Sequence, residues 1–212
     1  MNLSRTSLRA QIKDILLARI LNGEYTPGYR LIELQIAQEF GTSQAPVRES
    51  LRELEALGFV ESTPYRGTRV RNVTKTELIE AYAVRAALEE VAARAAASYF
   101  KDNVGALELK LAAMHQEADN GDLYELGRHD FEFHRLIVEA AANKVLQNVW
   151  KSLRIETHVL IGAMTIKVDP HEVVEMHRPL IEALASGDGE RAGTLIRQHL
   201  EYFGELIMQG KS

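Results

Sequence analysis

The chain has 212 residues, of which 46% are hydrophobic and 26% are charged, with a formal net charge of −5 and no cysteine. This length and composition predict one or two domains with packed cores, and the absence of cysteine excludes disulfides and thiolate metal sites. No apolar run reaches the roughly 18 residues of a transmembrane helix and the N-terminus lacks a signal-peptide core, so we expect a cytoplasmic protein without a membrane partner.

Charge is distributed unevenly along the chain. Residues 1–72 carry ten Lys and Arg against eight Asp and Glu, whereas the remaining residues carry 15 against 22. The first segment is therefore the part suited to a polyanion, despite the acidic total. Its basic surface would come from five arginines: Arg48, Arg52, Arg66, Arg69 and Arg71.

The first third of the sequence predicts three helices. One spans residues 6–22 and ends at Gly23, and a second carries an apolar stripe that ends at Phe40. Gly41 is suited to the left-handed residue after that helix. Ser43 stands at the N-cap position of a third helix, with Pro46 in its first turn and Gly58 at its end.

Two short strands should follow this third helix, over residues 59–62 and 69–71, with a tip formed by residues 64–67. Two helices joined by a glycine turn and followed by such a hairpin are typical of a winged helix-turn-helix. That fold places its second helix in a DNA major groove and its hairpin beside it.

Side chains on the outer face of the third helix are candidates for DNA contact. Gln44 and Arg48 are four residues apart and share a face, and Gln and Arg are the side chains that bond adenine and guanine bidentately. At the wing tip, Arg66 is suited to a phosphate or the minor groove. The candidate DNA-binding residues are Ser43, Gln44, Arg48, Arg52, Arg66 and Gly67; the alternative is that these are ordinary solvated surface charges.

This part of the chain resembles the GntR family of bacterial transcription regulators. The resemblance rests on P-G-Y-R-L-I-E at residues 27–33, S-Q-A-P-V-R-E-S-L-R-E-L at 43–54, and G-F-V and R-G-T-R-V up to Val70. The family often has Arg directly after the capping Ser or Thr, where this chain has Gln44, so its operator preference is expected to differ. Arg48 and the Arg66-Gly67 pair match the family pattern.

From residue 74 onward the pattern is helical throughout. Thr74 and Glu77 form a capping-box pattern, Asn143 is a cap, and Asp169-Pro170 is a strong helix start. Six helices are predicted, over residues 75–100, 103–119, 123–142, 144–167, 170–186 and 189–209. We therefore expect a mostly α protein with two domains: a winged helix-turn-helix over 1–73, and an all-α six-helix bundle over 74–212 for effector binding and dimerisation.

Four residues of the predicted bundle are candidates for a metal site. Asp130 and His134 share a helix face, while His177 and His199 lie on the last two helices, each within an apolar pattern. Ionisable groups on inner faces are costly unless they are paired or bind a metal. Three imidazoles and one carboxylate suit Zn²⁺ or another borderline divalent ion, and the alternative is that each histidine has its own local partner.

The same segments resemble the FCD ligand-binding domain of the FadR-type branch of the family, with a length nearer its VanR-like subgroup. The similar motifs are D-F-E-F-H-R at residues 130–135, M-H-R-P-L-I-E-A-L-A-S-G-D at 176–188 and A-G-T-L-I-R-Q-H-L at 192–200. In metal-containing members an Asp and three His at these positions hold the ion. The resemblance thus implies a divalent ion, with Zn²⁺ the first expectation and Ni²⁺ or Mn²⁺ as alternatives.

A small organic or sugar acid is the effector that the resemblance implies. An ion with five or six coordination positions would leave one or two for a carboxylate, and Arg85 is the candidate cation beside it. The alternative for Arg85 is a structural salt bridge to a carboxylate such as Glu89.

The resulting hypothesis is a transcription regulator, expected to be a repressor, that binds operator DNA as a homodimer under control of the acid. It is not expected to be an enzyme. Two alternatives are a regulator for which the metal itself is the signal and a metal-dependent hydrolase.

Overall fold

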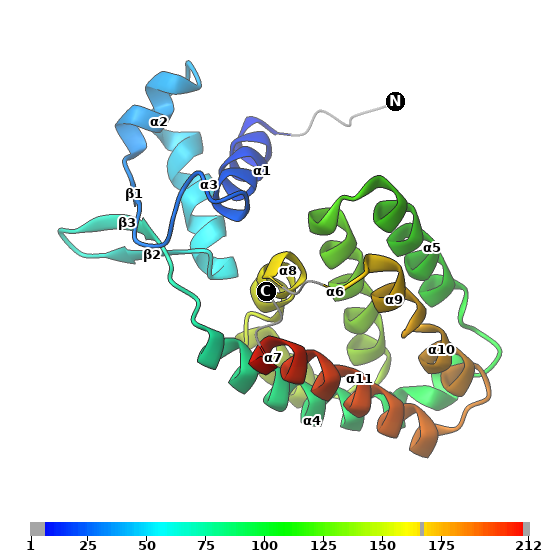
Figure 1. Cartoon of the computed structure of the whole chain (residues 1–212). Helices are drawn as coiled ribbons and strands as arrows, with labels where there is room; N and C mark the ends of the chain where they lie inside the picture. Colours follow the sequence, from blue (N-terminus) through cyan, green and yellow to red (C-terminus); the bar gives the residue numbers. More distant parts are fainter. Residues whose placement is uncertain (1–6, 166–167, 210–212) are drawn as a thin grey trace. The chain divides into compact units, whose positions relative to one another are not determined.

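The computed structural model describes residues 7–165 and 168–209, and the chain divides into two compact units, residues 1–73 and 74–212 (Figure 1). Within the described residues, no helix is both long enough and apolar enough to cross a membrane. The predicted helix over 6–22 is observed from Leu8 to Leu21, and its expected residue 6 lies outside the described residues.

The first unit is a winged helix-turn-helix. Helix α1 (Leu8–Leu21) packs on α3 (Gln44–Leu57), and α2 (Glu33–Glu39) is joined to α3 by a tight turn. Gly41 in that turn has a φ of +61° and Gly58 after α3 has a φ of +96°, so both glycines fulfil the left-handed role that the sequence predicts. The core between the helices consists of Ile12, Leu16, Leu17, Ile36, Ala37, Val47, Leu51 and Leu54.

The wing is three-stranded rather than two-stranded. Strands β2 (Val60–Thr63) and β3 (Gly67–Val70) form the predicted hairpin, and β1 (Arg30–Leu31) adds to the other edge of β3, giving the antiparallel order β1-β3-β2. A strand of two residues is too short to show alternation, which is why the sequence pattern misses it. Leu31, Phe59, Val60 and Val70 are buried and attach the sheet to the helices.

The second unit is all-α within the described residues and contains eight helices. They are α4 (Lys75–Phe100), α5 (Gly105–Asn120), α6 (Leu123–Ala140), α7 (Lys144–Ser152), α8 (Ile155–Thr165), α9 (Pro170–Glu175), α10 (Arg178–Ala185) and α11 (Gly189–Gln209). The predicted caps Thr74, Asn143 and Asp169 each accept a backbone N–H of the helix that follows.

Two of the six predicted helices are interrupted, which corrects that count. The helix predicted over 144–167 breaks at Arg154, a residue with a φ of +51° that no Gly or Pro announces, and its residues 166–167 lie outside the described residues. The helix predicted over 170–186 breaks before Arg178. Pro179 has no N–H to donate to the carbonyl of Glu175, so the break has a cause that is visible in the sequence.

Helix α11 lies along α4 (Figure 1). Glycine permits this close approach: a Cβ on Gly189 would lie 2.7 Å from the carbonyl oxygen of Arg94, and one on Gly193 would lie 2.5 Å from that residue's Cγ. Because α4 and α11 are the longest helices, their contact fixes the frame on which the site is built.

Candidate metal centre and nucleic-acid interface

Four buried polar residues meet inside the second unit. Asp130 and His134 project from α6, His177 lies between α9 and α10, and His199 lies midway along α11. One ligand-type atom from each lies within 4.8 Å of all the others. The structure thus brings together the four residues that the sequence singles out. Ligands of a tetrahedral Zn²⁺ at about 2.1 Å lie about 3.4 Å apart, so small movements would close such a shell.

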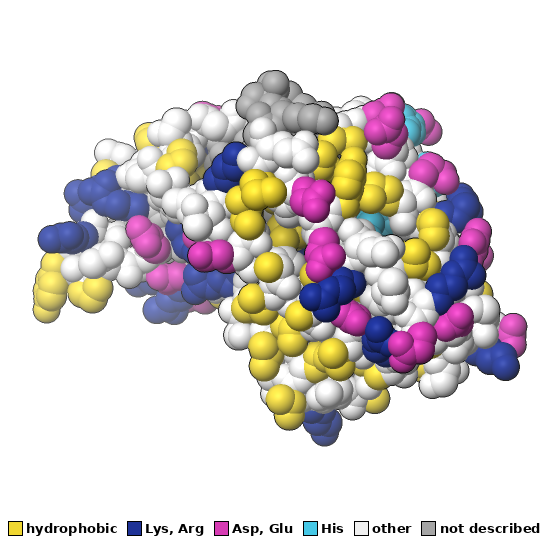
Figure 2. All heavy atoms as spheres, turned by 60° about the horizontal axis from the view of Figure 1, so that its bottom comes forward, with side chains coloured by type: hydrophobic (Ala, Val, Ile, Leu, Met, Phe, Trp, Pro, Cys, Tyr) yellow, Lys and Arg dark blue, Asp and Glu magenta, His cyan; other side chains and the backbone are white. Residues whose placement is uncertain are grey.

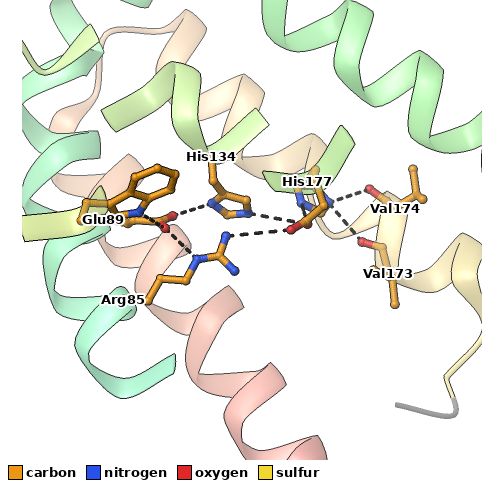
Figure 3. Close-up of polar contacts among 8 residues, drawn as sticks. Arg85, Glu89, His134, Val173, Val174 and His177 are labelled. Atoms are coloured by element: carbon orange, nitrogen blue, oxygen red, sulfur yellow. Dashed lines mark hydrogen bonds and ion pairs between the residues drawn. The ribbon is translucent and has the colours of Figure 1, made fainter. Parts of the chain in front are cut away.

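The break before α10 orients His177. Helix α9 ends at Glu175, and its last carbonyls, those of Val173 and Val174, lie 3.1 and 3.2 Å from Nδ1 of His177 (Figure 3). A carbonyl only accepts, so Nδ1 is the protonated nitrogen and Nε2 of the neutral ring carries the lone pair. That lone pair faces Oδ1 of Asp130 at 3.0 Å. Two acceptors facing each other call for a proton or a cation between them.

Glu89 orients His134 in the same way. Nδ1 of His134 lies 2.6 Å from Oε2 of Glu89, so Nδ1–H donates to that carboxylate and Nε2 carries the lone pair (Figure 3). Nε2 is buried, has no hydrogen-bond partner and lies 3.8 Å from Oδ1 of Asp130. Carboxylates hold metal-binding histidines in this manner in many proteins. No spacing in the sequence points to this role of Glu89, which was expected only as a partner of Arg85.

His199 completes the group. Both of its ring nitrogens are buried without a hydrogen-bond partner, and its ring stacks on that of His134 with centroids 5.3 Å apart. Burial lowers the pKa of His199 well below 6.5, and the neighbouring His177 and His134 lower it further. Burial also lowers the pKa of His134. Neutral imidazoles with free lone pairs are the form that binds metals.

Asp130 is charged in spite of its burial. Burial raises the pKa of Asp130, but His134, His177 and Arg85 together outweigh it and hold that pKa well below its ordinary value. A charged carboxylate and three buried imidazoles, with Nε2 of both His134 and His177 directed at the carboxylate, are a ligand set that fits a divalent metal ion.

Arg85 forms the salt bridge to Glu89 that the sequence analysis considered, and it also borders the metal group. Its Nε donates to Oε1 of Glu89 at 2.7 Å, while its Nη2 is buried without a hydrogen bond and lies 3.9 Å from Oδ2 of Asp130. Trp150 of α7 donates its indole N–H to the same Oε1 at 2.8 Å. One guanidinium nitrogen is thus left for a further acceptor.

A cavity of about 270 Å³ adjoins this group. Asp130 and His199 of the metal group reach it, as do Arg85 and Tyr82 of α4. Its remaining lining residues, among those that the structure describes, are apolar and come mainly from α6, α8 and the start of α9. The volume is just below the roughly 300–1,000 Å³ of typical small-molecule sites, so it suits a small ligand.

The remaining histidines lie outside the group. His115, His158 and His171 face carboxylates of Glu175, Glu77 and Asp119 at 3.0, 3.1 and 3.7 Å. His129 is largely buried beside Glu132, with 15% of its side chain exposed. Among the described residues, only the four named side chains form a group of this kind.

In the first unit, the candidate DNA-contacting side chains lie on the exposed side of α3. Ser43 stands at the N-cap position, but its hydroxyl does not cap the helix, and Gln44 in the first turn is exposed. Arg48 is exposed and its guanidinium is held by Glu33 of α2, with Nη2 2.8 Å from Oε2. Arg52 pairs with Glu49 at 2.8 Å and is also exposed. Two of these cations are therefore pre-positioned by carboxylates.

The wing tip carries the remaining candidates. Arg66 is exposed in the turn between β2 and β3, and among the described residues it makes no ion pair. Gly67 begins β3 with a φ of +77°. Of the other predicted basic residues, Arg69 donates to the carbonyl of Gly28 at 2.9 Å. Lys and Arg side chains cluster on the wing-bearing unit, at the left of Figure 2, interspersed with a few acidic ones.

Two family models match the chain. Residues 8–70 match the model described as bacterial regulatory proteins of the gntR family, and residues 80–202 match the FCD domain. Between them they cover the winged unit and nearly all of the helical unit.

Curated relatives and solved structures agree with these matches. A probable D-xylose utilization operon transcriptional repressor of Paenarthrobacter nicotinovorans is 36% identical over 93% of this chain and 88% of its own. The transcriptional repressor RspR of Escherichia coli K12 is 26% identical over 94% of this chain and 88% of its own. McbR/YncC of E. coli superposes with a TM-score of 0.74 at 23% identity, over 98% of this chain and 100% of that one. A GntR regulator of Rhodococcus sp. RHA1 superposes with a TM-score of 0.73 at 22% identity, over 96% of this chain and 99% of that one.

Proposed function

This chain belongs to the GntR family of bacterial transcriptional regulators with an FCD domain, and we propose that a divalent metal ion and a small carboxylate in its helical unit control its affinity for operator DNA. The observation that carries the proposal is the convergence of Asp130 and three histidines in the buried interior, with Nε2 of His134 and both ring nitrogens of His199 left without a hydrogen-bond partner. Buried acceptors without a partner are costly, and a cation would satisfy them together.

In this proposal, Asp130, His134, His177 and His199 hold the ion, with Zn²⁺ as the first expectation and Ni²⁺ or Mn²⁺ as alternatives. When bound, the ion would supply a positive charge that attracts an anionic ligand. Glu89 and the carbonyls of α9 keep the histidine lone pairs aimed at it. Arg85 offers its Nη2, which has no hydrogen-bond partner, to the same anion from the cavity side.

The first unit would bind DNA through α3 and the wing. Regulators of this family bind operators as dimers. Ser43, Gln44, Arg48 and Arg52 would enter or border the major groove, and Arg66 with Gly67 would contact the backbone or minor groove. Arg48 would exchange its Glu33 partner for a base or phosphate. Because two curated relatives are named repressors, we propose that the acid relieves repression.

The metal half of the proposal is tested by metal analysis of protein purified without chelator. We expect about one divalent ion per chain in the wild type and loss of most of it in His177→Ala. His171→Ala, an exposed histidine only six residues away, is the matched control and should retain the ion. Equal metal content in all three proteins would refute the site.

The DNA half is tested by mobility shift with the chain's own upstream DNA at moderate salt. Arg48→Ala should weaken binding, whereas Arg178→Ala, which removes the same charge from the exposed start of α10, should not. Equally weak binding by wild type and Arg48→Ala would overturn the DNA-binding role.

A second pair of mobility-shift measurements distinguishes this proposal from the alternative in which the ion itself is the signal. The proposal expects the metal-loaded protein to respond to an added acid. A response to chelation alone, with none to any acid, would favour the metal as the signal.

A further inference from the structure

The cavity beside the metal group is lined by a polar and an apolar set of residues, which come mostly from different helices. Its polar residues, Tyr82, Arg85, Asp130 and His199, come from the middle parts of α4, α6 and α11. Among the residues that the structure describes, the other lining residues are apolar: Leu123, Leu126, Gly127, Val159, Ala163, Met164, Val168, Pro170, Val173 and Phe203. A ligand with its charged group beside Arg85 would place most of its remaining atoms against these apolar side chains.

The formal charges of the buried groups around the metal group can be added up. Arg85 contributes one positive charge, and Asp130 and Glu89 one negative charge each, all three buried. The three histidines bind a metal in the neutral form. The protein's own groups therefore sum to −1, and a divalent ion brings the sum to +1. Uncompensated charge is costly in a buried site, and a single further negative charge leaves it neutral.

The apolar lining residues disfavour polar atoms on the rest of the ligand. Val159, Leu126 and Phe203 are at most 8% exposed, so a group placed against them loses its contact with water. A hydroxyl or a second carboxylate there would lose its hydrogen bonds to water, and of the polar set only the Tyr82 hydroxyl, which lies beside α8, could replace one of them among the described lining side chains. An alkyl tail would lose nothing and gain the burial of apolar surface.

We infer that the effector is a monocarboxylate with a short alkyl tail, such as a 2-hydroxy or 2-oxo acid, and not a polyhydroxylated sugar acid or a dicarboxylate. This inference rests on the proposed function of the metal centre and goes further by choosing among the acids that it allows. The carboxylate meets the ion and Nη2 of Arg85, and the tail lies between α6, α8 and α9.

The test is calorimetric titration of the metal-loaded full chain with three acids that share a four-carbon skeleton. They are 2-hydroxybutanoate, malate and erythronate, which end in a methyl group, a carboxylate and a hydroxylated carbon chain. We expect 2-hydroxybutanoate to bind at least about tenfold more tightly than either of the others. Lengthening it to 2-hydroxypentanoate should tighten binding about fourfold for the added methylene.

A wall variant tests the placement of the tail. Val159→Thr keeps the volume but adds a hydroxyl to the cavity wall, and it should weaken binding of 2-hydroxypentanoate several-fold without changing metal content. Val149→Thr makes the same change on the exposed face of α7, outside the cavity lining, and should leave binding unchanged. Metal content also reports whether each variant has kept the fold of the site.

The outcomes separate this inference from the proposed function. If malate or erythronate bound most tightly to metal-loaded protein, the alkyl-tail inference would be overturned while acid binding at the metal centre would stand. If none of the four acids bound to protein that carries its ion, the acid-sensing function itself would be overturned.

Discussion

Glu89 is the residue on which the buried network of the helical unit converges. Its carboxylate accepts from His134, Arg85 and Trp150, which lie on three different helices. Burial raises the pKa of Glu89, but Arg85 and His134 outweigh it and lower the pKa to about 2. A single side chain thereby connects the metal group, the cation of the cavity and the core.

Replacing Glu89 by Gln tests this role. The variant keeps the shape but removes the charge, so it should reduce metal affinity by about 10- to 100-fold and destabilise the helical unit by about 3–5 kcal/mol. Chelator competition and urea denaturation measure the two effects. Glu201→Gln, at a half-exposed ion pair on α11, should change neither by a comparable amount. If Glu89→Gln kept the metal affinity of the wild type, the orientation of His134 would not depend on the charge of Glu89.

The histidines predict a pH dependence with a definite sign. The pKa values of His199 and His134 are lowered in the folded protein, so below about pH 6.5 the unfolded chain binds more protons than the folded one. The stability of metal-free protein should therefore fall as the pH drops from about 7 towards 5. The lowered pKa values of Asp130 and Glu89 add a further loss only below about pH 4.

Denaturation midpoints across this pH range measure the effect. His199→Asn should flatten the dependence between pH 7 and 5, and His171→Asn, an exposed site, should retain it. A wild-type midpoint that is constant over this range would contradict the buried, neutral state of these rings.

At the scale of elements, the contact of α4 with α11 depends on small residues. A Cβ on Gly189 would meet the backbone carbonyl of Arg94, which cannot rotate away, whereas a Cβ on Gly193 would meet that residue's flexible side chain. Gly189→Ala should thus cost about 1–3 kcal/mol, measured by urea denaturation. Gly105→Ala, where a Cβ would have nothing within 4 Å, is the matched control and should be close to neutral.

Helix α3 carries a second prediction at this scale. Gln44 is exposed in its first turn, where the family often has Arg. Gln44→Arg should tighten DNA binding at low salt and steepen the slope of log K against log salt by about 0.9, the value for one added phosphate contact. An unchanged slope would mean that the first turn of α3 does not approach the DNA backbone.

For the whole molecule, the metal ligands connect α6, the junction of α9 and α10, and α11. Removing the ion should lower the stability of the helical unit, by about 2.7 kcal/mol where free metal had been about 100-fold above its Kd. Calorimetry should then show one transition that shifts by about 10 °C and returns when metal is added back. The transition of the winged unit should not move, because the ligands all lie in the other unit.

The sequence predicts these features unevenly. Caps and glycines at Thr74, Gly41 and Gly58 are local signals and mark their elements correctly. The break at Arg154 has no local signal, since a left-handed non-glycine residue there is imposed by the surrounding packing. Pro179 does signal the break before α10, but an apolar pattern that continues across it hides the signal.

The candidate site shows the same division. Spacing and resemblance identify Asp130 and the three histidines, whereas the contact of Glu89 with His134 joins residues 45 positions apart. Such pairings depend on how helices pack, which one sequence does not encode in any short pattern. The cavity likewise draws its walls from five helices, so its lining depends on how these helices pack.

Trp150 is the only tryptophan of the chain. Its indole N–H donates to the carboxylate of Glu89, which also accepts from His134 and Arg85. The ring also stacks on Phe131, with centroids 5.2 Å apart. Any event that shifts electron density at this carboxylate changes the surroundings of the single indole. The protein therefore contains its own optical probe: the emission of one unlabelled fluorophore should report, in real time and in dilute solution, the arrival of an ion or an acid at the neighbouring centre.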